Sequence, residues 1–200
     1  MYRPAVVYTA AAMPVEPSDE DLMLRYGSGD AAAFDVLYTR HRAGVFRYLL
    51  RQCGNRGAAE ELVQDIWLNL IQARDRYRVE AKFTTWLYTL AHNRLIDHFR
   101  RHKGPQLVSL DADGEDDPLE LPAHSTMQPE RQAQAREQVA HLLWLVEALP
   151  PVQRETFLLH EEGGLSLEQI AQVTGAGRET VKSRLRYALD KLREGMKDHL

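Results

Sequence analysis

Side chains that suit contact with nucleic acid recur near the C-terminus of the chain. They are Arg178, Lys182, Ser183, Arg184, Arg186 and Lys191. An Arg guanidinium can read guanine in the major groove of duplex DNA, and Lys or Arg can hold phosphates. A charged helix face that only meets water is the competing interpretation, since runs of charge are usually solvated. The choice depends on the elements that carry these residues.

A short helix is predicted just before this basic segment. Ser166 followed by Gln169 is a capping box, which marks a helix start. The apolar residues that this helix would turn inward are Ile170, Ala171 and Val173. The segment Thr174-Gly175-Ala176-Gly177 then predicts a tight break, because Gly175 can adopt the left-handed conformation that ends a helix.

A second helix follows the break and has one apolar face. That face is formed at 3.6-residue periodicity by Val181, Leu185, Leu189, Leu192 and Met196. Glu179, Ser183 and Arg186 point the other way. Ser166 to Arg193 is therefore predicted to be a helix-turn-helix, whose second helix protrudes and suits the major groove.

Composition limits the remaining possibilities. The chain has 200 residues, 44% of them hydrophobic, and a net charge of −4. This length suits one ordinary domain or two small ones, and the apolar runs are too short to span a bilayer, so no membrane insertion is expected. Residues 1–17 are predicted to be a flexible leader, because Pro4, Pro14 and Glu16 interrupt any signal-peptide core.

The sequence gives little support for an enzyme active site or a metal site. The sequence has no Gly-rich phosphate loop and no nucleophile with a matched base. His98 and His102 are one turn apart, but Arg100 and Arg101 would repel a cation there. Cys53 is the single cysteine, so we expect a buried structural thiol in a reducing cytoplasm rather than a disulfide or a redox switch. No cofactor, metal, catalytic residue or small-molecule substrate is predicted.

Apolar periodicity predicts helices in the first half of the chain. Ser18 should cap a helix over Asp19–Tyr26, and Asp30 should cap a longer one that reaches about Cys53. Further helices are expected at Ala58–Arg74 and Phe83–His102.

Aromatic side chains crowd the start of the last of these helices. They are Tyr77, Phe83, Trp86 and Tyr88, and they precede the polar and basic residues Asn93, Arg94, Arg100, Arg101 and Lys103. Aromatic rings beside cations are what unpaired bases stack on. Phe83 and Trp86 taken singly could equally well be core residues.

Residues 104–128 have no periodic apolar face and contain several prolines and an acidic run, so they are predicted to be a flexible linker. Pro129 should open a helix to about Leu149, followed by one over Val152–Glu162. The helix that begins at Pro129 is expected to turn inward Ala135, Val139, Leu142, Leu143, Val146 and Leu149. The predicted fold is all-α, with small helical domains over residues 18–103 and 129–200.

Three segments, in this order, resemble the extracytoplasmic-function (ECF, group 4) RNA polymerase sigma factors. Residues 61–67 resemble the segment that binds the clamp helices of RNA polymerase. Residues 86–100 resemble the promoter-melting and minus-ten recognition segment. Leu149-Pro150 with the helix-turn-helix resembles the domain that reads the minus-thirty-five element.

The resemblance implies a role for three groups of residues. Glu61, Gln64 and Asp65 would contact core RNA polymerase. Minus-ten DNA, including the melted strand, would meet Tyr77, Lys82, Phe83, Trp86, Asn93, Arg94 and Arg100. Duplex minus-thirty-five DNA would meet Arg178, Lys182, Ser183, Arg184, Arg186 and Tyr187. An anti-sigma factor is a further implied partner, and the implied location is the cytoplasm.

The sequence also departs from the family pattern. Many members have Arg where Tyr187 stands and a basic residue where Leu189 stands, so we expect base readout to differ there. Val79 and Glu80 occupy a place where some relatives have a glycine-containing stretch. The alternative function is a stand-alone helix-turn-helix regulator, which would bind its operator without polymerase, usually as a dimer.

Overall fold

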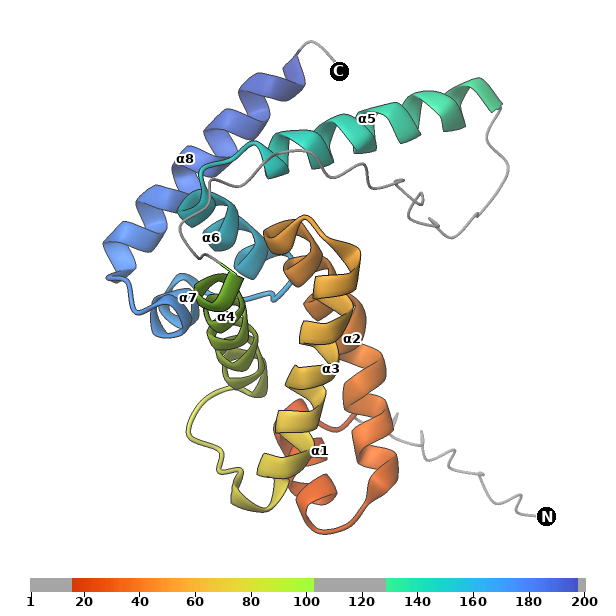
Figure 1. Cartoon of the computed structure of the whole chain (residues 1–200), viewed down its shortest axis with the longest axis vertical. Helices are drawn as coiled ribbons and strands as arrows, with labels where there is room; N and C mark the ends of the chain where they lie inside the picture. Colours follow the sequence, from red (N-terminus) through yellow and green to blue (C-terminus); the bar gives the residue numbers. More distant parts are fainter. Residues whose placement is uncertain (1–15, 103–128, 198–200) are drawn as a thin grey trace, which may run out of the picture.

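The computed structural model describes residues 16–102 and 129–197, and within them the chain is helical with no strand (Figure 1). The helices are α1 (Asp19–Gly27), α2 (Ala31–Cys53), α3 (Arg56–Ala73), the 3₁₀ helix η1 (Arg74–Arg76), α4 (Phe83–His102), α5 (Pro129–Glu147), α6 (Pro151–Glu161), α7 (Leu167–Thr174) and α8 (Arg178–Met196). The predicted linker, residues 104–128, and most of the predicted leader lie outside the described residues.

Local capping explains where the first helices begin and end. The Ser18 hydroxyl accepts from the Asp21 N–H, as predicted. Asn55 caps α3, whose start at Arg56 is therefore earlier than the predicted Ala58. Asp30 occupies the position before α2 but makes no side-chain capping bond. Its carboxylate accepts from Arg25 Nη2 at 2.6 Å.

The N-terminal helices pack around α2. Helices α1 and α3 both contact α2, and α4 crosses against α3 and α2. An aromatic cluster fills one end, where Tyr26 and Tyr38 flank Phe34 and the Trp67 ring meets Tyr38 edge-on at 4.9 Å between centroids. Aromatic rings bury large apolar areas, so this cluster supplies much of the packing at that end.

The C-terminal helices form the predicted helix-turn-helix. Ser166 and Gln169 make both bonds of the capping box at the start of α7. Gly175 ends α7 with a left-handed φ of 68°. Val181 is fully buried in the angle between α7 and α8, and α6 packs along α8.

Helix α5 differs from the prediction in how it is buried. Ala135, Val139 and Leu142, predicted to face a core, are exposed, whereas Val146 and Leu149 are buried. The reason is that, among the described helices, the later part of α5 packs against its neighbours, while its first part extends away from them (Figure 1). An apolar stripe shows which side of a helix prefers burial, but not whether a partner covers it.

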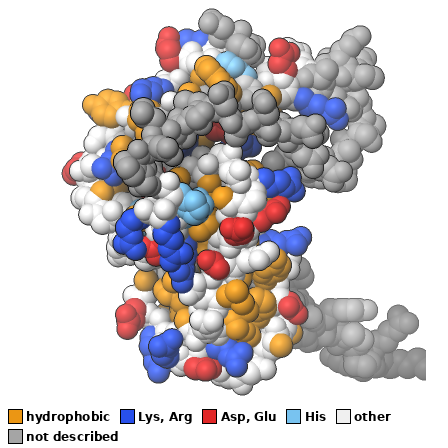
Figure 2. Space-filling model, viewed as in Figure 1, with side chains coloured by type: hydrophobic (Ala, Val, Ile, Leu, Met, Phe, Trp, Pro, Cys, Tyr) orange, Lys and Arg blue, Asp and Glu red, His pale blue; other side chains and the backbone are white. Residues whose placement is uncertain are grey.

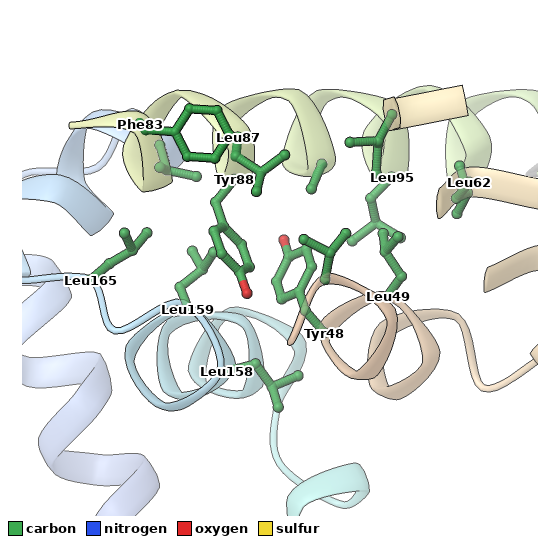
Figure 3. Packing of buried hydrophobic residues seen from close by; sticks show 14 of the residues in the cluster. Tyr48, Leu49, Leu62, Phe83, Leu87, Tyr88, Leu95, Leu158, Leu159 and Leu165 are labelled. Carbon is green, nitrogen blue, oxygen red and sulfur yellow. The ribbon is translucent and has the colours of Figure 1, made fainter. Parts of the chain in front are cut away.

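The two groups of helices are joined by one continuous apolar core. Helix α4 packs on α7, and α2 packs on α6. Figure 3 shows Leu87 and Tyr88 of α4 facing Tyr48 of α2 and Leu159 of α6 across this junction. The sequence predicted two domains but not their contact.

None of the helices in the described ranges is long and apolar enough to cross a membrane.

The turn of the helix-turn-helix provides a test of the fold. A Cβ at Gly175 would meet no atom within 4 Å, so a substitution there costs only backbone conformation. We expect Gly175→Ala to lower the free energy of unfolding by about 1–2 kcal/mol, measured by urea denaturation. Gly175→Asn should cost clearly less, because Asn tolerates the left-handed region. Equal losses for both variants would contradict this assignment.

Candidate nucleic-acid interface

Helix α8 exposes a basic and aromatic surface. Lys182 and Arg186 lie one turn apart and both are exposed. Tyr187 is 49% exposed, and the Arg186 guanidinium lies over its ring, 4.9 Å from the centroid. This pair presents a cation and a flat apolar ring together, where the sequence predicted base contacts.

The other predicted residues of α8 are placed differently. Arg178 is held across the turn, where its guanidinium donates to Glu168 and, at 2.8 Å, to Glu179. The bond to Glu168 raises the pKa of Arg178 and lowers that of Glu168. Ser183 donates to the Glu179 carbonyl of its own helix at 2.7 Å, and Arg184 is half-buried. The bond between Arg178 and Glu168 fixes the start of α8 relative to α7.

The segment between η1 and α4 is anchored by buried aromatic rings. Tyr77 is 6% exposed and Phe83 is fully buried, whereas Trp86 is half-buried. The Tyr77 and Trp86 ring centroids are 5.1 Å apart. The N–H of Phe83 donates to Glu20 Oε1 at 2.7 Å, so a carboxylate of α1 caps α4. Trp86 is the aromatic ring of this group that solvent reaches most.

A shallow hollow of about 380 Å³ lies beside Trp86. Its lining includes Arg76, Arg78, Glu80, Thr85, Trp86 and Gln172. Thr85 and Gln172 were not identified from the sequence, and Gln172 belongs to α7, far along the chain. Tyr77 also lines the hollow, and burial raises the pKa of its hydroxyl to about 12. Within the described residues that hydroxyl has no hydrogen-bond partner.

The remaining predicted minus-ten residues lie on the loop and along α4. Lys82 and Asn93 are exposed. Arg94 is half-buried and donates to Asn69 Oδ1 at 2.9 Å, which ties α4 to α3. Arg100 is 75% exposed and pairs with Asp97 at 2.9 Å. Basic groups thus continue from the hollow towards the end of α4.

A separate acidic surface lies on α3. Glu61, Gln64 and Asp65 are all exposed and occupy one face of the helix. Leu68, 54% exposed, continues this face and was not identified from the sequence. An exposed leucine beside acidic groups suits a protein partner better than DNA. On the face drawn in Figure 2, Lys and Arg side chains are interspersed with Asp and Glu.

In the described ranges, no three His, Cys, Asp or Glu side chains are grouped so that they could hold a metal ion. His98 and His102 stack on each other with centroids 4.2 Å apart.

The Cys53 thiol donates to the Leu49 carbonyl at 2.8 Å, and burial raises its pKa to about 11. A thiol this far from ionisation is inert at neutral pH.

The fold and these surfaces define a class: a helical protein with a helix-turn-helix, built to bind DNA and a protein partner. Two family models match the chain. The model for sigma-70 region 2 matches residues 37–104, and the model for sigma-70 region 4 matches residues 142–192.

The sequence is similar to those of known proteins over most of its length. The RNA polymerase sigma factor CarQ of Myxococcus xanthus is 30% identical, over 86% of this chain and 94% of its own length. The ECF sigma factor SigE of Mycolicibacterium smegmatis is 30% identical, over 92% of this chain and 72% of its own. The chain therefore belongs to the ECF family of RNA polymerase sigma factors. Members are transcription initiation factors and not enzymes.

Solved structures share the fold. CnrH in complex with the cytosolic domain of CnrY matches with a TM-score of 0.61 at 22% identity, covering 88% of this chain and 95% of that one. RpoE in complex with the anti-sigma factor NepR from Bartonella quintana matches with a TM-score of 0.62 at 19% identity. The match covers 82% of this chain and 96% of that one.

The raised pKa of Cys53 predicts that its thiol is alkylated slowly. At pH 8 a thiol with a pKa of about 11 is ionised far less than an ordinary cysteine, so we expect iodoacetamide to react about 100-fold more slowly. The rate should rise as pH approaches the raised pKa. An exposed thiol made by Ser28→Cys in a Cys53→Ser background is the control. Equal rates at pH 8 for the two thiols would show that Cys53 is accessible and reactive.

Proposed function

We propose that this protein is a group 4 sigma factor that acts in the cytoplasm with core RNA polymerase. In this proposal residues 129–200 read duplex minus-thirty-five DNA, and residues 18–103 bind polymerase and the melted minus-ten strand. The observation that carries the assignment is the hollow beside Trp86, which Arg76 and Arg78 also line, in a chain that presents an exposed recognition helix as well.

At the minus-thirty-five element, α8 lies in the major groove. Lys182 contacts phosphates, while Arg186 and Tyr187 reach base edges as a stacked pair. Arg178 and Ser183 support this surface from the start of the helix, since their side chains are already bonded to neighbouring groups. Arg184, half-buried, adds charge close to the backbone of the DNA.

At the minus-ten element, the hollow receives one extruded base and Trp86 stacks on it. Extruding a base costs a few kcal/mol, and stacking on an aromatic ring returns about 1–3 kcal/mol per base. Lys82, Asn93 and Arg100 hold the strand, with Arg94 fixed against α3. Because the rings of Tyr77 and Phe83 are buried, we assign them the task of positioning Trp86.

The acidic face of α3 binds the polymerase. Glu61, Gln64 and Asp65 meet basic and amide groups of a helical partner, and Leu68 supplies an apolar contact at the edge of that face. Two structural relatives were solved with protein partners: RpoE with the anti-sigma factor NepR, and CnrH with the cytosolic domain of CnrY. We propose that an anti-sigma factor restrains this protein as well.

Run-off transcription tests the function. Core polymerase with this protein should produce transcripts from candidate promoters that neither component produces alone, while the protein alone gives little gel shift. Asp65→Lys should reduce transcript at least ten-fold, because it reverses a charge in the polymerase contact. Asp35→Lys, the same charge reversal at an exposed position of α2, is the matched control and should be close to wild type. A strong sequence-specific shift without polymerase, and no transcript with it, would indicate a stand-alone regulator instead.

The stacking role of Trp86 is tested with two templates. Trp86→Ala should lower transcription from linear duplex DNA about ten-fold, through loss of stacking on the extruded base. On a template whose minus-ten region is already unpaired, the loss should be much smaller, because melting is no longer required. Trp144→Ala removes a 61% exposed tryptophan of α5 and serves as the control. An equal loss on both templates would refute a role for Trp86 in melting.

A further inference from the structure

Helix α4 begins without a capping side chain of its own. Phe83 is its first residue, and the residue before it, Lys82, carries an ammonium group that only donates hydrogen bonds. The Lys82 carbonyl accepts from the Trp86 N–H at 3.2 Å, so Lys82 stands at the N-cap position. The first turn of α4 contains no acidic side chain. The N–H groups at this helix start therefore need an acceptor from another part of the chain.

Glu20 of α1 supplies that acceptor. Its Oε1 accepts from the Phe83 N–H at 2.7 Å, across 63 positions of sequence. A carboxylate at a helix start is favoured twice, because it satisfies an unpaired N–H and because it lies at the positive end of the helix dipole. Phe83 is fully buried (Figure 3), so water does not reach its N–H in place of Glu20. The start of α4 thus depends on α1.

Helix α1 is itself held against α2 next to this bond. Asp19, the neighbour of Glu20, accepts from Arg40 at 2.9 Å, and its other carboxylate oxygen lies 2.7 Å from His41 Nε2. The His41 ring also packs on Phe83, with centroids 5.3 Å apart. Adjacent carboxylates of one helix therefore reach two different elements, α2 and the start of α4.

Tyr77, at the other end of the loop before α4, lies near the same two carboxylates. Burial raises the pKa of its hydroxyl, and the charges of Glu20 and Asp19 add to that shift. The ring of Trp86 has its centroid 5.1 Å from that of Tyr77 and 5.9 Å from that of Phe83. Trp86 therefore packs on two rings that both lie beside α1.

These contacts come from a helix that the family model does not include. The match to sigma-70 region 2 begins at residue 37, and α1 precedes it. The loop and first turn that α1 anchors carry Lys82 and Trp86, which we assign to the melted strand. A binding group has to be held to within about 0.5 Å of its working position, which requires neighbours that lock it in place.

We propose that Glu20 is a positioning residue for promoter melting. Its carboxylate fixes the start of α4, and the start of α4 places Trp86 where the extruded base arrives. Glu20 acts through the Phe83 backbone and not by contact with DNA. This inference rests on the proposed function, because it concerns the proposed minus-ten site.

Two substitutions of Glu20 in the full-length protein test this role. Glu20→Ala removes the acceptor, so we expect run-off transcription from linear duplex DNA with core polymerase to fall about ten-fold. On a template whose minus-ten region is already unpaired, the loss should be below about two-fold, because correct stacking matters most for melting. Glu20→Gln keeps an oxygen that accepts from the Phe83 N–H and should retain most of the transcript. Asp21→Ala removes an exposed carboxylate of the same helix and is the control.

A purely structural role for Glu20 predicts a different pattern. A less stable protein would lose activity alike on both templates, so equal losses for Glu20→Ala would overturn the inference. A loss for Glu20→Gln as large as that for Glu20→Ala would also overturn it, because an acceptor would then not be what the start of α4 needs.

A second cap for α4 provides a test that holds even if Glu20→Ala folds poorly. Lys82→Ser introduces a hydroxyl at the N-cap position, which accepts from an N–H of the first turn. Because this change removes a proposed contact to the strand, the Lys82→Ser protein is the reference. In that background Glu20→Ala should cost less than about two-fold on the duplex template. A cost of about ten-fold there would show that Glu20 does not act through the start of α4.

Comparison with Trp86 separates this inference from the function on which it rests. If Trp86→Ala shows the difference between the two templates and Glu20→Ala does not, only the positioning role is wrong. If the wild-type protein yields no transcript with core polymerase, the proposed function itself fails.

Discussion

Two tyrosine hydroxyls are buried where α2, α4 and α6 meet, and each needs a hydrogen-bond partner there. Tyr48 finds Glu155 and Tyr88 finds the Glu162 carbonyl, and both acceptors belong to the C-terminal half. A buried polar group without a partner costs about 1–3 kcal/mol, so the two halves dock in one register. Burial raises the pKa of both hydroxyls, which therefore remain protonated donors at any ordinary pH.

Helix α4 connects this constraint to function. Leu87, Tyr88 and Ala91 bury one side of it among the helices of both halves. The opposite side is left for Asn93 and the basic residues that continue to the end of the helix. The bond from Phe83 to Glu20 fixes where α4 starts, and with it the position of Trp86. One helix thus sets both the docking of the halves and the place of the nucleic-acid contacts.

What could be predicted from the sequence was local. The capping box at Ser166 and the break at Gly175 depend on residues a few positions apart, and both predictions are confirmed. The exposure of Val139 was missed, because periodicity does not say whether a partner covers an apolar face. The pairing of His92 with Glu155, which are 63 positions apart, could not be predicted, since many other charges of suitable sign compete for each side chain.

Gly44 has a consequence for how this protein could change over generations. Almost any replacement there would strengthen α2 as a helix, because glycine is a poor helix residue. The same replacement would meet the Glu162 carbonyl and push the halves apart. A more stable α2 and a close contact between the two groups of helices are therefore opposing demands at this one position.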